Sequence, residues 1–292
     1  MSYTSGIINI PSVTGDIVIT AVAASVTVTS ISASFNQGGN PVYTTDTLDS
    51  LRQYLTVTAT YSNGSTAPVS LYTLSGTLTV GTSTITVTYE SKTTTFNVTV
   101  SAITLDTVVY EGKSYRDIFI TANQLQGFDF EDGLPSGMTS NAGSPSISED
   151  DCYSVTHSMK AFGTSSTQYK SVNTTGVADW NKYANTMYFC AYKGRCDRYV
   201  SGNLGISLAT SLFPAITAVT DGWVTKHNYV TNTSGSGTGQ AFVGSYTSAN
   251  LDGYIDDIVY IPLANVFSTM PSEANILQWY EEYCDLRKAG EV

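Results

Sequence analysis

Charged residues are scarce in this sequence, and basic residues are the scarcer kind. Only 13% of the 292 residues are charged, and 13 Lys and Arg stand against 24 Asp and Glu, for a formal net charge of −11. A nucleic-acid partner requires basic side chains gathered against the phosphates, whereas here they are scattered along the chain. We therefore expect no nucleic-acid binding. Since no run approaches 18 consecutive apolar residues, we expect no membrane insertion either.

Histidine and cysteine are also few, with two and four copies. His157 and His227 lie in strand-like segments without metal-ligand spacing, and no CxxC pair occurs. The nucleophile elbow GxSxG and the phosphate loops GxxxxGKS/T and GxGxxG are missing as well. The sequence thus predicts a protein that is not an enzyme. Cys190 and Cys196 flank AYKGR, a predicted turn, so they are either bridged across a hairpin or two unpaired strand cysteines.

The N-terminus, MSYTSGIINIPSVTGDI, lacks the basic and apolar parts of a secretory signal. We therefore expect the chain to stay where it is made unless it leaves by cell lysis. Within residues 1–25, IINI predicts a short strand, residues 14–16 a turn, and the alternation in residues 17–22 a second strand. Two isolated strands are marginal in water, so this attachment segment must pack on the next domain, a sister subunit or a larger assembly.

Thr, Ser, Val, Ile and 20 Tyr dominate what is present, and such residues favour sheets. In residues 26–101, short strands recur between turn signals, which is typical of a β-sandwich. The dipeptide Asn63-Gly64 predicts a type I′ hairpin turn with two positive φ angles. The stretch TDTLDSLRQY predicts one helical turn capped by Asp46 or Thr47.

Two stretches of this region, LDSLRQYLTVTATYSNGST and YTLSGTLTVGTSTITVTYESKTTTFNVTV, resemble bacterial immunoglobulin-like domains. They are most similar to the versions in structural proteins of phages and prophages of Gram-positive gut bacteria. INIPSVTGDIVITAVA is similar to a segment of phage tail and fibre proteins. The resemblance implies an Ig-like sandwich in a virion structural protein.

Residues 102–125 predict a connector with strand-like pieces, and residues 126–267 a series of short strands typical of a jelly roll. Residues 268–292 contain the one clear helix, 272–289, capped by Ser272 and stopped by Gly290. Its apolar face predicts docking on the jelly roll or on a neighbouring subunit. The predicted fold class is therefore all-β: an N-terminal β unit, an Ig-like sandwich, and a jelly roll with a C-terminal helix.

The third region also resembles carbohydrate-binding modules and lectin-like jelly rolls. FDFEDGLPSGM is similar to their opening strand, TMYFCAYKG to a central strand, DGWVTKHNYVT to a late Trp-bearing strand and GYIDDIVY to the closing strand. In that family the Trp of the DGW strand is usually structural, which implies a structural role for Trp223.

Acidic residues cluster at both ends of this region: Asp129, Glu131 and Asp132 at the start, and Asp252, Asp256 and Asp257 at the end. They suit three roles: solvated turn acids, a pair of catalytic carboxyls, or a calcium site. The resemblance implies a structural calcium between the opening and closing strands. It makes Glu131 and Asp256 the best ligands and leaves Asp132 and Asp257 in reserve, because alternation sends neighbours to opposite faces.

Aromatic residues crowd the same region, and sugar rings stack on flat aromatic faces. Trp180 lies in the polar stretch ADWNKY, which favours its exposure. We predict Trp180 and Tyr183 as ligand contacts, the alternative being that they are ordinary sandwich core residues.

Together these features predict a non-enzymatic virion protein: a fibre, decoration or receptor-binding component that displays a glycan-binding jelly roll toward the host surface or mucus. The phage resemblance implies other virion proteins as partners and a homo-oligomer. The alternatives are a carbohydrate-binding adhesin of a bacterial surface or secreted complex and, last, a glycan lyase or hydrolase.

Overall fold

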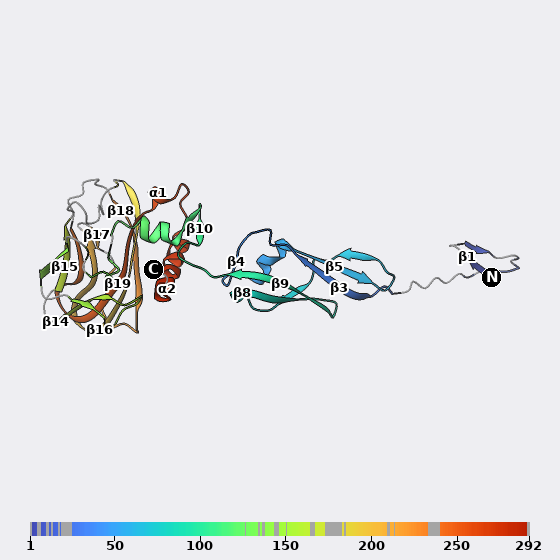
Figure 1. Cartoon of the computed structure of the whole chain (residues 1–292), viewed down its shortest axis with the longest axis horizontal. Helices are drawn as coiled ribbons and strands as arrows, with labels where there is room; N and C mark the ends of the chain where they lie inside the picture. The colour runs from blue at the N-terminus through green and yellow to red at the C-terminus, as the bar shows by residue number, and fades with distance from the viewer. Residues whose placement is uncertain are drawn as a thin grey trace. The chain divides into compact units, whose positions relative to one another are not determined.

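The computed structural model forms two compact units, Met1–Ala102 and Ile103–Val292. It describes residues 2–4, 7–9, 12, 14–16, 18, 25–125, 127–133, 135, 138–142, 146–149, 151–163, 167–172, 183, 185–208, 211–212, 214–232 and 240–290. Both units are built mainly of strands, with short helical turns and one long helix at the C-terminus (Figure 1). The predicted all-β class is confirmed.

The N-terminal segment contains a small hairpin of β1 (Ser2–Thr4) and β2 (Ile7–Asn9). The two strands are antiparallel, with Tyr3 opposite Ile8. The strand predicted in residues 17–22 lies outside the described residues, apart from Val18, which is 88% exposed.

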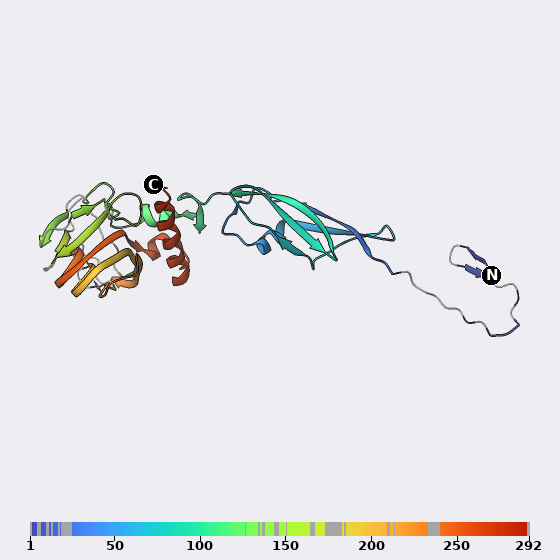
Figure 2. The same cartoon turned by 90° about the horizontal axis from the view of Figure 1, so that it is seen from below.

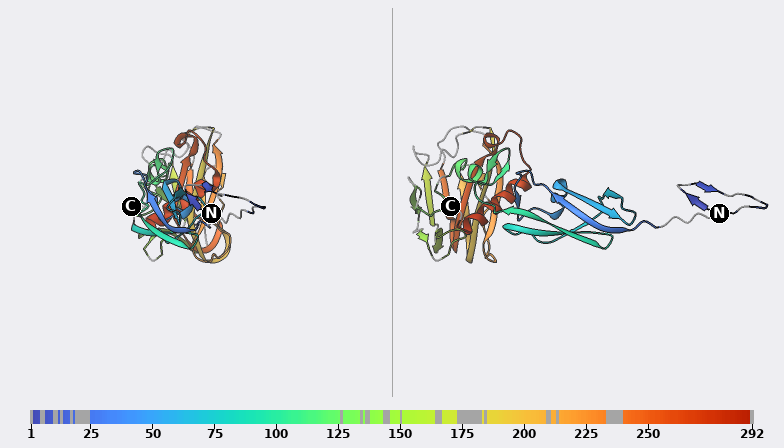
Figure 3. Two further views of the ribbon diagram at one scale, coloured as in Figure 1. Left: turned by 90° about the vertical axis from the view of Figure 1, so that its right-hand side faces the viewer. Right: turned by 45° about the vertical axis from the view of Figure 1, so that its right-hand side comes forward.

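The rest of the first unit is a sandwich of two sheets, which Figure 3 shows as blue and green strands. One sheet has the order β3 (Val28–Phe35), β5 (Leu55–Tyr61), β6 (Thr66–Pro68). The other has the order β4 (Val42–Tyr43), β9 (Lys92–Ser101), β8 (Gly81–Tyr89), β7 (Thr73–Ser75). Alternate residues such as Ile85, Val87 and Val98 are fully buried between the sheets, as the period of two requires.

Local predictions in this unit had mixed outcomes. The predicted helical turn is present as η1 (Leu48–Tyr54), and the Thr47 hydroxyl caps it by accepting from the Ser50 N–H at 3.2 Å. The type I′ turn at residues 63–64 was wrong, because only Gly64 takes a positive φ, +80°. The Asn63 side chain instead accepts hydrogen bonds from the N–H and hydroxyl of Ser65, which holds a different turn.

The segment assigned to a connector is part of the second unit from residue 103 onward. It forms β10 (Val108–Tyr110), β11 (Lys113–Ser114) and a π-type turn, η2 (Arg116–Thr121). Ile118 and Phe119 are fully buried and pack in one cluster with the C-terminal helix. The segment carries apolar residues that pack against the C-terminal helix, and for this reason its composition differs from that of a flexible linker.

Within the described part of the second unit, eight strands form the sandwich: β12 (Met138–Ala142), β13 (Ser146–Ser148), β14 (Ser158–Gly163), β15 (Thr167–Val172), β16 (Thr186–Leu208), β17 (Ser211–Leu212), β18 (Val224–Asn232) and β19 (Gln240–Pro262). The two 23-residue strands, β16 and β19, run antiparallel to each other. β19 pairs with β15 through its first part and with β14 further along. β16 pairs first with β18 and at its end with β17.

These two long strands therefore belong to two layers, and they bend where the register shifts between Cys196 and Asn203. The layers face each other, because the Tyr192 hydroxyl on one half of β16 contacts the Leu204 carbonyl on the other half at 3.3 Å. A Cβ at Gly205 would stand 2.6 Å from the Tyr192 hydroxyl, so the packing requires glycine there.

The cysteine prediction needs a correction in this context. Cys190 and Cys196 both lie on β16, so AYKGR is strand and not a turn. Both thiols are free and fully buried in the core. Apolar core surroundings suit unpaired cysteines.

The C-terminal helix, α2 (Glu273–Lys288), follows a short turn, α1 (Leu263–Val266). The Ser272 hydroxyl caps it by accepting from the Asn275 N–H, as predicted. Tyr280 and Cys284 are fully buried against Phe189 and Val259 of the long strands, so the helix docks on the sandwich (Figure 2). Within the described part of the chain, no helix has the length and apolarity to cross a membrane.

Candidate functional site

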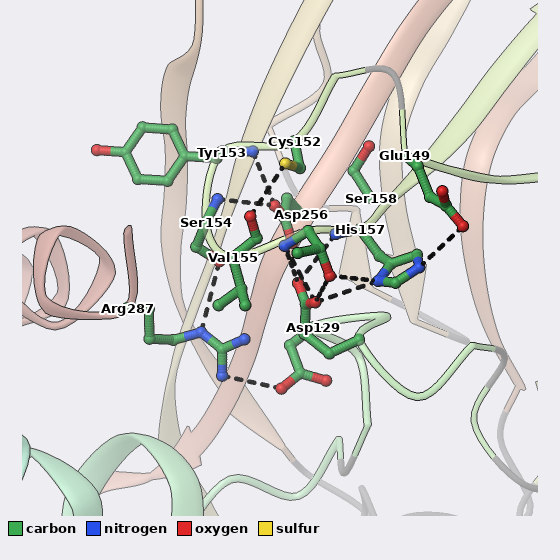
Figure 4. A network of polar contacts seen from close by, with 12 residues as sticks. Asp129, Glu149, Cys152, Tyr153, Ser154, Val155, His157, Ser158, Asp256 and Arg287 are labelled. Carbon is green, nitrogen blue, oxygen red and sulfur yellow. Dashed lines mark hydrogen bonds and ion pairs between the residues drawn. The ribbon is translucent and has the colours of Figure 1, made fainter. Parts of the chain in front are cut away.

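The segment from Asp151 to His157, called here the 151–157 loop, joins β13 to β14 and is held by buried acids (Figure 4). Asp256 Oδ2 accepts from the N–H groups of Tyr153 at 2.9 Å and Ser154 at 3.1 Å. Asp257 Oδ1 accepts from the Ser154 hydroxyl at 2.9 Å. The two aspartates of the closing strand thus fix the middle of the loop.

Glu131 holds the far end of the same loop. Its carboxylate accepts from the Thr156 N–H at 3.1 Å, from the Thr156 hydroxyl at 2.7 Å and from the His157 N–H at 3.1 Å. Glu131 and Asp256, which were predicted as calcium ligands, both bind the 151–157 loop through its N–H and hydroxyl groups. Asp132, by contrast, is exposed.

Arg287 supplies positive charge to this group from the last turn of α2. Its side chain is 3% exposed and pairs with Asp129 at 2.9 Å and with Asp257 at 3.0 Å. Burial raises the pKa of Asp257 to about 6, while the Arg287 charge opposes the rise. Burial, and then the neighbouring Asp257 charge, raise the pKa of Asp256.

These carboxylates do not fit a calcium site. Calcium takes six to eight oxygen ligands, yet the oxygens of Glu131 and Asp256 are occupied by N–H and O–H donors of the protein. The guanidinium of Arg287 would also repel a cation beside Asp257. Among the described residues, no group of three or more His, Cys, Asp or Glu is arranged to hold a metal.

The outer side of the 151–157 loop contacts Trp223. The Trp223 Nε1–H donates to Asp151 Oδ1 at 3.2 Å, and Arg195 forms an ion pair with the other Asp151 oxygen. The Tyr153 ring meets the indole edge to face at 5.9 Å, and the Tyr254 ring lies 6.3 Å away. The 151–157 loop therefore holds the Trp223 indole in place next to the rings of Tyr153 and Tyr254, and these three residues form one aromatic group.

A groove of about 780 Å³ opens next to this aromatic group. The strand register places Ser146, Lys160, Tyr254 and Arg195 in one row across β13, β14, β19 and β16. Trp223 directly precedes Val224, which lies opposite Gly194, and so continues the row on the next strand. The groove is lined by Ser146, Ile147, Ser148, Glu149, Lys160, Asp197, Asp252 and Tyr254.

Ion pairs hold the charged groups at the groove in place. Arg198 donates to both oxygens of Asp252, at 2.7 and 3.2 Å, and to Asn250 Oδ1 at 2.7 Å. Arg195 donates to Asp197 at 2.6 Å, and the Lys160 ammonium lies 5.3 Å from the centre of the Tyr254 ring. Donors and acceptors are thus fixed in position, and each of the two arginines is matched by a carboxylate.

The structure describes one of the two aromatic residues predicted as ligand contacts, Tyr183. Trp180 lies outside the described residues, and Tyr183 is partly buried against the core, where its N–H donates to the Tyr188 hydroxyl at 3.2 Å. Trp223, set aside as structural, is the indole next to the groove. In the sequence, Trp223 is the residue directly before the strand β18. Which side chains surround its indole follows only from the pairing of β18 with β16.

Residues 43–100 match the bacterial Ig-like domain (group 3) family, which confirms the Ig-like nature of the first unit. No curated protein matches the chain.

The chain is also similar to solved carbohydrate-binding modules. A family 16 carbohydrate-binding module is 16% identical, over 48% of this chain and 99% of that one, with a TM-score of 0.38. The CBM22-1 xylan-binding domain from Paenibacillus barcinonensis Xyn10C is 14% identical, over 46% of this chain and 90% of that one, with a TM-score of 0.34. A module solved with β-1,4-galactotriose is 16% identical, over 48% and 98%, with a TM-score of 0.33.

Proposed function

We propose that the second unit binds a glycan in the groove beside Trp223 and that the chain is a non-enzymatic adhesion protein. The observation that carries the proposal is the row of Lys160, Tyr254, Arg195 and Trp223, in which Lys160 and Tyr254 line an open groove of about 780 Å³. Sugar hydroxyls both donate and accept hydrogen bonds, and sugar rings stack on aromatic faces. A fixed set of Ser, Lys, Asp and Arg groups next to an indole suits such a ligand.

The charge arrangement favours a neutral glycan. Arg195 and Arg198 are both paired with carboxylates, and Glu149, Asp197 and Asp252 offset Lys160. The groove therefore offers no excess positive charge to an anionic ligand. Because Asp197 and Asp252 are both engaged by arginines, the groove is suited to holding a ligand and not to general acid catalysis.

We place this binding activity in a phage virion, as a fibre, decoration or receptor-binding component. Support comes from the sequence of residues 26–101, which resembles the Ig-like domains of phage structural proteins. Partner virion proteins and a homo-oligomeric assembly belong to the same proposal. The Ig-like match is equally compatible with an adhesin of a bacterial surface.

Two measurements test the proposal separately. A glycan microarray probed with the full chain should show binding to neutral oligosaccharides, and a blank array would overturn the binding function. Immunogold labelling of purified phage particles with antibodies against the chain should decorate the virion. Labelling of the bacterial cell surface in place of particles would establish the adhesin alternative.

A further inference from the structure

Three segments far apart in sequence meet at one guanidinium in the second unit. Arg287 Nη1 donates to Asp129 of the opening segment at 2.9 Å, and Arg287 Nε pairs with Asp257 of the closing strand at 3.0 Å. Ser154 of the 151–157 loop donates its hydroxyl to the same Asp257 oxygen. The Arg287 side chain is 3% exposed and that of Asp257 is fully buried. A single buried cation thus joins the opening segment, the loop and the closing strand, and Figure 4 shows its contacts with Asp129 and Ser154.

The neighbouring carboxylates are complete without any further cation. Asp256 Oδ1 accepts from the Asp257 N–H at 2.8 Å, while Oδ2 takes the two loop N–H groups. Glu131 uses both oxygens on Thr156 and His157. Each of these acceptors already has a donor directed at it, and a metal would have to break those bonds.

The two remaining polar atoms suit a water better than a metal. Among the described residues, Asp257 Oδ2 and Arg287 Nη2 are the buried side-chain atoms that have no hydrogen-bond partner. Both residues line a cavity of about 50 Å³. One free acceptor and one free donor across a space of this size match the hydrogen bonds of a bridging water. A divalent ion there would face the guanidinium.

We propose that Arg287 replaces a structural calcium ion in this unit. The helix α2 carries the cation that ties the opening and closing strands to the 151–157 loop, so the unit folds and stays folded without divalent metal. The helix is therefore an integral part of the sandwich. This inference concerns stability and does not depend on whether the groove binds a glycan.

Thermal unfolding of the full chain, monitored by tryptophan fluorescence, tests the proposal. All three tryptophans, at positions 180, 223 and 279, lie in the second unit, so the signal isolates its transition. We expect the Tm in excess EDTA and in millimolar CaCl₂ to agree within about 1 °C. Calcium at a hundredfold excess over its Kd would raise the Tm by about 5 °C or more, and a rise of that size would overturn the proposal.

The Arg287→Ala variant gives the second arm of the test. Removing one partner of a buried ion pair leaves an uncompensated charge, so the tryptophan-reported Tm should fall by about 5 °C or more. Lys288→Met is the matched control, since Lys288 is the next residue of the same helix and is exposed, and it should melt within about 2 °C of the wild type. If the Arg287→Ala variant had the same Tm as the wild type, Arg287 would not be the group that joins the opening and closing strands to the 151–157 loop.

Discussion

Trp223 and Asp151 lie 72 positions apart in the sequence, yet the indole N–H of one donates to the carboxylate of the other at 3.2 Å. The same carboxylate forms the ion pair with Arg195. Through Asp151, the buried acids beneath the 151–157 loop therefore set the orientation of the aromatic group at the groove. The loop is the physical link between the interior network and the proposed binding surface.

The contact makes Asp151 a positioning residue. Its Ala and Asn variants should show whether glycan affinity depends on the hydrogen bond to the Trp223 indole or on the Asp151 charge. Asp151→Ala frees the indole and should weaken glycan binding about tenfold, a loss of about 1.4 kcal/mol. Asp151→Asn keeps an oxygen acceptor for Trp223 and should retain most of the affinity. Titration calorimetry of both variants with the best array ligand checks this. If Asp151→Asn lost as much affinity as Asp151→Ala, the indole hydrogen bond would not be the determining contact.

Gly253 is predicted to be essential for the packing of β19 against β16. A Cβ at this position would stand 2.6 Å from the Arg195 carbonyl oxygen, a backbone atom that cannot rotate away. Gly253→Ala should therefore destabilise the second unit by about 1–3 kcal/mol, measured by urea unfolding followed by tryptophan fluorescence. Gly15→Ala is the control, since no heavy atom lies within 4 Å of a Cβ there, and it should leave this transition unchanged. An unchanged midpoint for Gly253→Ala would contradict the strand register.

Tyr229 should make stability depend on pH at the alkaline end. Its hydroxyl donates to the Glu273 carbonyl oxygen at 2.7 Å, and burial raises its pKa from 10.0 to about 12. Because the folded state holds this proton more tightly than the unfolded state, the stabilisation is complete below pH 10 and is lost as the pH rises through about 12.

The matching variant is Tyr229→Phe, which removes the hydroxyl and keeps the ring. At pH 7 it should lower the free energy of unfolding by about 1 kcal/mol, the net value of one hydrogen bond. Urea unfolding at a series of pH values should show the gap between wild type and variant closing above pH 10. A gap that stayed constant up to pH 12 would mean that the pKa of this hydroxyl is not perturbed.

The sequence was most informative where structure is determined locally. The cap of α2 at Ser272, the cap of η1 at Thr47 and the alternation of Ile85 and Val87 all follow from residues within a few positions of each other. The carbohydrate-binding resemblance singled out Glu131 and Asp256 as calcium ligands, whereas in the structure their carboxylates accept hydrogen bonds from one loop.

What the sequence did not predict depends on contacts between distant residues. AYKGR was mistaken for a turn because Lys, Gly and Arg are usual in turns, whereas here they continue β16, with Lys193 buried. The ion pairs of Arg287 with Asp129 and Asp257 could not be foreseen from the sequence, because they depend on the packing of α2. Trp223 was assigned a structural role from the family resemblance, and its place beside Tyr254 could not be foreseen because it depends on the register of three strands.

The most direct measurement of the central claim is titration calorimetry of the full chain with its best neutral oligosaccharide from the array. We predict that Trp223→Ala and Lys160→Ala each reduce the affinity about tenfold or more. Lys226→Ala, on β18 but outside both the groove lining and the row that Trp223 continues, should bind as the wild type does. Full affinity in Trp223→Ala and Lys160→Ala, with binding retained in the wild type, would contradict the assignment of this groove.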